Sequence, residues 1–202
     1  MPEQARLRIY GEGRIEVKLA TAFLDDLRLT YDALTVFISE TERRRREWRD
    51  FPPYPFLNPR FGRFSWEAPN PERLSSFVPR SQHLVLNSVQ LNSPGFWEFL
   101  GSLNPLEVTR QYLNDRHERR KDRKYRETAE QRRMALENLG RENAVLKERI
   151  EIMRGLGATN SDLAPLLNDL VYKPLTALDR YQDVQVIDSA ELLKLSDEKE
   201  DE

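Results

Sequence analysis

Apolar and polar residues alternate over residues 6–10 and again over residues 14–19, on either side of a glycine-containing turn. An apolar residue at every second position on both sides of such a turn predicts a β-hairpin with one buried face. The spacing of apolar residues then lengthens to three and four from Ala20 to Ile38. That spacing predicts a helix, which should end before the prolines at positions 52 and 53.

The same order of elements recurs later in the chain. Residues 83–91 and 96–100 read as strands on either side of a turn at residues 92–95, and Pro105 can begin a helix. Two hairpin–helix units predict an α+β fold with a small four-stranded antiparallel sheet and two helices on one face. We therefore expect a head domain over residues 1–104, interrupted by an irregular insertion rich in proline and aromatic residues at 50–82.

A long charged stretch follows the predicted head. Between Pro105 and Gly155 the only residue that disfavours a helix is Gly140. The sequence therefore predicts one helix over residues 105–155, about 75 Å long at 1.5 Å per residue. Beyond it, residues 156–195 predict a short helix, a strand at 184–187 and a further helical turn, and residues 196–202 an acidic, disordered tail.

The second half of this long helix carries a heptad pattern. The positions that would face a second helix are mostly apolar, and Asn143 interrupts them, as in seams of two parallel strands. The residues predicted for self-association are Leu136, Leu139, Asn143, Leu146, Ile150 and Met153. The pattern favours a homodimeric coiled coil, whereas the leucine-rich segment from Leu163 to Leu178 offers an alternative by folding back over the same stripe.

The first half of the helix is basic. It carries eight Lys or Arg between positions 110 and 126, and the candidates for nucleic-acid binding are Arg116, Arg119, Arg120, Lys121, Arg123, Lys124 and Arg126. A basic helix that leads into a heptad seam resembles the basic-leucine-zipper plan, which implies a dimer bound in the DNA major groove. The resemblance covers about a fifth of the chain. It departs from the family at the eighth residue after Asn114, where Asp122 replaces the basic residue.

The insertion supplies a third candidate surface. Aromatic residues with arginine are enriched at protein interfaces. The candidate partner-binding residues are Tyr54, Phe56, Phe61, Arg63, Phe64 and Trp66. The alternative is that these rings cover the exposed face of the small sheet.

The amino-acid composition bears on nucleic-acid binding and on membrane association. Hydrophobic residues make up 39% and charged residues 33% of the 202, and the net charge is −2, so no basic excess drives nucleic-acid binding. Without cysteine, a signal-like start or an apolar run of about 20 residues, the chain is expected to be cytoplasmic and not membrane-bound.

Catalytic patterns are absent from the sequence. The two histidines lack metal-ligand spacing, and no glycine-rich phosphate loop occurs. We therefore expect no enzyme activity, cofactor or metal, but an adaptor or scaffold module that self-associates and presents its head to another protein. The alternative is a dimeric nucleic-acid binder that uses residues 110–126.

Overall fold

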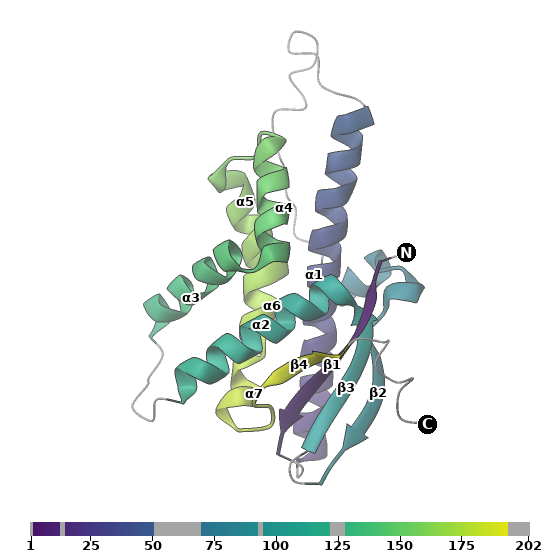
Figure 1. Ribbon diagram of the computed structural model, residues 1–202, viewed down its shortest axis with the longest axis vertical. Helices are drawn as coiled ribbons and strands as arrows, with labels where there is room; N and C mark the ends of the chain where they lie inside the picture. The colour runs from purple at the N-terminus through teal and green to yellow at the C-terminus, as the bar shows by residue number, and fades with distance from the viewer. Residues whose placement is uncertain (1, 13–14, 51–69, 93–94, 122–127, 194–202) are drawn as a thin grey trace.

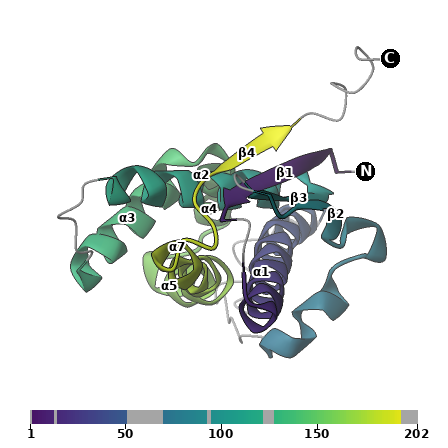
Figure 2. The same ribbon diagram turned by 90° about the horizontal axis from the view of Figure 1, so that it is seen from below.

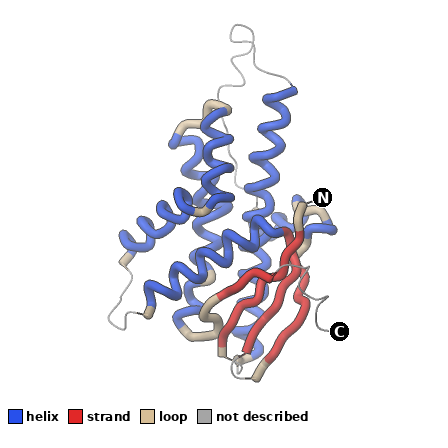
Figure 3. The backbone as a smooth tube through the Cα atoms, in the orientation of Figure 1, coloured by secondary structure: helices blue, strands red, loops and turns tan. Residues whose placement is uncertain are grey.

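The computed structural model describes residues 2–12, 15–50, 70–92, 95–121 and 128–193 (Figure 1). Four strands form one antiparallel sheet in the order β2-β3-β1-β4 (Figure 3). Their bounds are β1 (Gln4–Gly11), β2 (Val85–Gln90), β3 (Gly95–Ser102) and β4 (Ala190–Leu193). The predicted α+β class with a four-stranded antiparallel sheet is confirmed, as is the hairpin of β2 and β3.

Helices account for most of the remaining described chain. They are α1 (Val17–Asp50), η2 (Pro71–Phe77), η3 (Arg80–Gln82), α2 (Leu103–Arg120), α3 (Ala129–Glu142), α4 (Ala144–Gly155), α5 (Asn160–Leu167), the π-helical turn η4 (Asn168–Tyr172), α6 (Lys173–Ala177) and α7 (Asp179–Asp183). Helix α1 runs under one face of the sheet (Figure 2) and also contacts α2, α4, η4 and α6. It is thus a central element, packed by the sheet and by the later helices.

Aromatic rings join the sheet to α1 and to the C-terminal helices. The Phe23 ring of α1 is fully buried and meets Trp97 of β3 edge-on, with ring centroids 5.8 Å apart. It also meets Tyr181 of α7 edge-on at 5.3 Å. Edge-to-face pairs of this kind add to the free energy gained from burying the rings. Segments far apart in the chain therefore share one core.

The first predicted hairpin is wrong in its second strand. Residues 15–19 do not pair with β1; helix α1 begins at Val17, whose side chain is 82% exposed. Ile15, Leu19 and Phe23 are spaced by four, so this short apolar run fits a helix as well as a strand. Packing of α1 against the sheet decides between the two periods.

The fourth strand comes instead from the C-terminal part of the chain. Strand β4 pairs with β1 over four residues, with Leu7 opposite Leu192. The strand predicted at 184–187 and the helical turn predicted after it are therefore also wrong. A four-residue strand carries too little alternation to be recognised in the sequence, and only the free edge of β1 selects it.

The predicted long helix is broken into three, so no rod extends from the head. Helix α2 ends at Arg120. Thr128 caps the start of α3 with a capping box, in which the Thr128 hydroxyl accepts a hydrogen bond from the backbone N–H of Gln131 at 3.2 Å. Asn143 then separates α3 from α4, because its side chain accepts from the Leu146 amide at 3.0 Å. Each cap replaces a helical hydrogen bond, which allows the chain to turn without loss of bonded groups.

Gly101 and Tyr31 lock α1 to the end of β3. A Cβ on Gly101 would lie 2.9 Å from the Tyr31 ring, so the close approach requires glycine. The Tyr31 hydroxyl donates to the Gln82 carbonyl at 2.7 Å and accepts from the Ser102 amide at 2.8 Å. This contact aligns α1, η3 and the start of α2.

Candidate functional site

The residues predicted for self-association lie inside the core. Leu136, Leu139, Asn143, Leu146, Ile150 and Met153 are each 9% exposed or less within the single chain. Helix α4 packs on α1 and α2, and α3 packs on α4. A seam for a second helix at these positions is therefore wrong, and the stripe is covered within the chain, where α4 contacts α1 and α2 and not only the segment Leu163–Leu178 of the fold-back alternative.

Asn143 has a different role from the one that the heptad suggested. Its side-chain oxygen caps α4, and its amide nitrogen donates to Gln111 Oε1 of α2 at 2.8 Å. It thereby ties the α3–α4 corner to α2. An Asn followed by an apolar run is also a helix-start signal, and here that local signal overrides the heptad.

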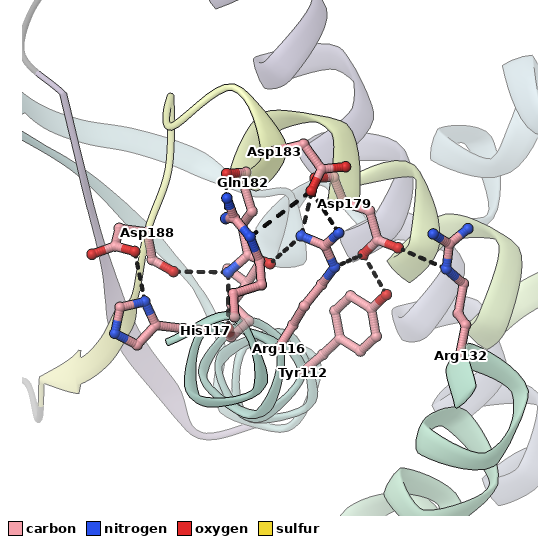
Figure 4. A network of polar contacts seen from close by, with 10 residues as sticks. Tyr112, Arg116, His117, Arg132, Asp179, Gln182, Asp183 and Asp188 are labelled. Atoms are coloured by element: carbon pink, nitrogen blue, oxygen red, sulfur yellow. Dashed lines mark hydrogen bonds and ion pairs between the residues drawn. The ribbon is translucent and has the colours of Figure 1, made fainter. Parts of the chain in front are cut away.

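The basic run of α2 meets acidic residues of α7 (Figure 4). Arg116 is 3% exposed; its guanidinium lies 3.1 Å from Asp179 Oδ1 and 2.8 Å from Asp183 Oδ1. Tyr112 donates to the same Asp179 oxygen at 2.6 Å, and Arg132 of α3 lies 3.3 Å from the other. We name Tyr112, Arg116, Arg132, Asp179 and Asp183 the Asp179 cluster.

The rest of the basic run is largely engaged as well. Arg120 donates to the Gln182 carbonyl, Lys121 pairs with Glu118 at 2.6 Å, and Arg119 also has a partner. Phosphate binding would have to break these contacts. The other candidates, Arg123, Lys124 and Arg126, lie outside the described residues, so no observation favours a nucleic-acid interface. The partner-binding candidates Tyr54, Phe56, Phe61, Arg63, Phe64 and Trp66 also lie outside them.

One edge of the sheet is covered. At β4, the Asn114 side chain of α2 donates to the Ala190 carbonyl and accepts from the Ala190 amide, both at 2.8 Å. The Asn114 side chain thus occupies both backbone hydrogen-bonding groups of Ala190, the first residue of this edge strand. Helix α2 runs beside this edge in both ribbon views (Figures 1 and 2).

The other edge is formed by β2, and all six of its residues are exposed. Residues 84–91 contain no charged residue and no proline, although a third of the chain is charged. Natural edge strands are usually protected by such residues. The exposed apolar side chains here are Val85, Leu86, Val89 and Leu91, at 39% to 56%.

A β-bulge at Asn87 and Ser88 changes the faces of β2. Leu86 pairs with Phe99 and Val89 pairs with Trp97, and both partners are core residues. Leu86 and Val89 therefore point to the same face of the sheet, although three positions separate them. The sequence predicted this strand, but nothing local in it could show that the strand would lie at an open edge.

A groove lies between α4 and α5. This α4–α5 groove has a volume of about 450 Å³ and is lined by Glu137, Gly140, Arg141, Lys147, Ile150, Glu151, Arg154, Asn160, Leu163, Ala164, Leu167 and Tyr172. Leu163 and Leu167 form an apolar floor together with Ile150, whereas exposed cations lie at the rim. A groove of this size, with an apolar floor and a charged rim, suits a small molecule that is apolar at one end and charged at the other.

Tyr172 enters the groove from the π-helical turn η4. Single π-helical turns inside helices are rare and often occur at functional sites. A Cβ on Gly140 would lie 3.3 Å from Tyr172 Oη, so glycine leaves space for the hydroxyl. Burial raises the pKa of this hydroxyl, Glu137 raises it further and Arg141 acts in the opposite direction. Tyr172 is therefore a protonated hydrogen-bond donor at neutral pH.

Asp32 is a buried carboxyl group that lines neither the β2 edge nor the α4–α5 groove. It lies on α1, is 2% exposed and sits 3.3 Å from Arg28 Nη1. Burial raises its pKa above 3.8, although Arg28 and His83 act in the opposite direction. The folded chain then holds this proton more tightly than the unfolded chain does. The stability that the protonated Asp32 carboxyl contributes is present below the unfolded-state pKa and is lost as pH rises through the folded-state pKa.

Replacing Asp32 by asparagine, which does not ionise, is expected to remove this loss of stability with rising pH. The free energy of unfolding of Asp32→Asn, relative to the native sequence, should therefore increase from about pH 3 to pH 7. Urea unfolding at the two pH values measures the change, with the exposed Asp25→Asn on the same helix as the control. A relative stability that falls with pH would show that the ion pair with Arg28 outweighs burial.

The described residues contain no group of three or more His, Asp or Glu that could hold a metal ion. Within the same ranges, no helix has both the length and the apolar character that crossing a bilayer requires. Searches against models of protein families, curated proteins and solved structures found nothing that matches this chain.

Proposed function

We propose that the protein is a non-catalytic interaction module that self-associates by joining the β2 edges of two copies. The observation that carries the proposal is an exposed edge strand without charged residues, in a sheet whose opposite edge packs against α2 and is bonded to Asn114. Pairing two such strands would give a continuous eight-stranded antiparallel sheet. The unpaired backbone groups of both edges would then be satisfied.

A two-fold axis between Asn87 and Ser88 makes β2 self-complementary. In this register Leu86 lies opposite Val89 of the second copy, and both belong to the same face because of the bulge. Val85 likewise lies opposite Gln90 on the other face. No like charges meet, since β2 has none. The interface is small, so we expect a weak dimer that forms at tens of micromolar.

Two further expectations remain proposals. An adaptor or scaffold role requires a second protein, and the insertion at residues 50–82 is still the candidate surface for it. Cytoplasmic localisation also stays a prediction. The helical seam is not part of the proposal, because its residues are buried.

A lysine in β2 tests the dimer. Light scattering between about 10 and 200 micromolar should show the native chain approaching a dimer, whereas Val89→Lys should stay a monomer, because its charge faces Leu86 in an apolar patch. Val184→Lys is the matched control: Val184 is 56% exposed and lies next to α7, away from β2. A native chain that is monomeric throughout this range sinks the proposal.

Cross-linking tests the register. The chain has no cysteine, so a disulfide formed by the double variant Leu86→Cys, Val89→Cys can only join introduced residues. Mild oxidation should give a covalent dimer that disappears under reduction. A dimer that persists in Val89→Lys and does not cross-link would assign self-association to another surface.

A further inference from the structure

Three cations on the rim of the α4–α5 groove are incompletely neutralised. Lys147 has no ion-pair partner among the described residues, and Arg154 contacts only the neutral Asn160 amide oxygen, at 3.2 Å. Arg141 lies 3.5 Å from Glu137, but Glu137 also pairs with Arg133 at 2.5 Å. The rim thus favours an anionic group.

The Tyr172 hydroxyl adds a directed donor. It has no hydrogen-bond partner in the part of the chain that the structure describes, and it faces Gly140 beside Glu137 and Arg141. A neutral hydroxyl can donate to a carboxylate in a charge-assisted hydrogen bond. Glu151 is the one acid of the groove without an ion-pair partner in the described chain, and it disfavours a second negative charge on the ligand.

We propose that the α4–α5 groove binds a small amphiphilic carboxylate. The carboxylate meets Tyr172 and the cations Arg141 and Lys147, and the apolar body of the ligand covers Ile150, Leu163 and Leu167. This inference uses no residue of the β2 edge, so it stands or fails independently of self-association.

Three probes of equal chain length separate charge from apolar contact. Octanoate, octan-1-ol and octylammonium share an apolar body and differ in the head group. Isothermal titration calorimetry with the full chain should give the tightest binding for octanoate, roughly tenfold tighter than octan-1-ol because a hydrogen bond to a charged group is strong. Equal binding of octanoate and octan-1-ol, preferred binding of octylammonium, or no binding at millimolar concentration overturns the proposal.

Variants identify the groups responsible. Tyr172→Phe should weaken octanoate binding roughly tenfold and octan-1-ol binding by less, because the lost hydrogen bond is stronger to a carboxylate than to an alcohol. Lys147→Gln should weaken it roughly two- to fivefold at low salt, whereas Lys18→Gln, the same charge change on the exposed start of α1, should have no effect. Glu151→Gln should tighten octanoate binding. If Lys147→Gln and Lys18→Gln behave alike and Tyr172→Phe binds normally, the carboxylate does not occupy this groove.

Discussion

Leu146→Arg is expected to unfold the protein, not to dissociate a dimer. Leu146 is fully buried in α4, and it belongs to the same hydrophobic core as Leu139, which is 2% exposed. Removing a buried leucine side chain costs about 2–5 kcal/mol, and an unpaired charge at the same position costs more. Domains of this size have total stabilities of about 5–15 kcal/mol. The variant should therefore be insoluble or lack a cooperative unfolding transition.

Circular dichroism and urea unfolding measure this result. The matched control is Met134→Arg, since Met134 is on α3 and 47% exposed. Its stability should lie within about 0.5 kcal/mol of the native chain. A folded, monomeric Leu146→Arg of native stability would mean that the stripe faces solvent, as in the seam predicted from the heptads.

Asp179→Ala is expected to lose about 3–5 kcal/mol of stability, because it removes one partner of the buried ion pair with Arg116. Asp179 is 4% exposed, and Arg116 lies 3.1 Å from its carboxylate. Tyr112 loses its acceptor in the same variant. The affected groups come from α2, α3 and α7, so the loss should loosen the contact between α2 and the C-terminal helices.

Asp183→Ala is the control for that variant. Asp183 also pairs with Arg116, at 2.8 Å, but its side chain is 55% exposed. Exposed ion pairs contribute about 0–1 kcal/mol, so the control should unfold close to the native chain. Equal losses in the two variants would show that burial does not set the strength of the Asp179 cluster, and thermal unfolding at matched pH decides the point.

Elements that have a clear hydrophobic period and a clear stop signal were predicted correctly from the sequence. The hairpin of β2 and β3, and the helix that ends before Pro52, were predicted because each has a clear period and a clear stop signal. The break before α3 was also readable, since Thr128 and Gln131 form a capping box. The single long helix was predicted because residues 105–155 contain no helix-disfavouring residue except Gly140, and that absence does not exclude a break at a capping box.

No local pattern could reveal the candidate surfaces. Tyr172 and Gly140 meet across 32 positions, and Asp179 meets Tyr112 across 67, while nothing near any of them in the chain marks the contact. The openness of β2 has the same origin: β4 and Asn114 occupy the opposite edge of the sheet. Which edge stays free is a property of the assembled sheet.

Periodicity, caps and proline positions alone were enough for the α+β class, for the β2–β3 hairpin and for the long first helix, because those signals act over a few neighbouring residues. Packing over long separations decided the rest. It turned residues 17–19 into helix, recruited residues 190–193 as the fourth strand and buried the leucine stripe within one chain. The sequence of a short apolar run does not determine which surface will cover it, because burial depends on every other element that competes for the same contact.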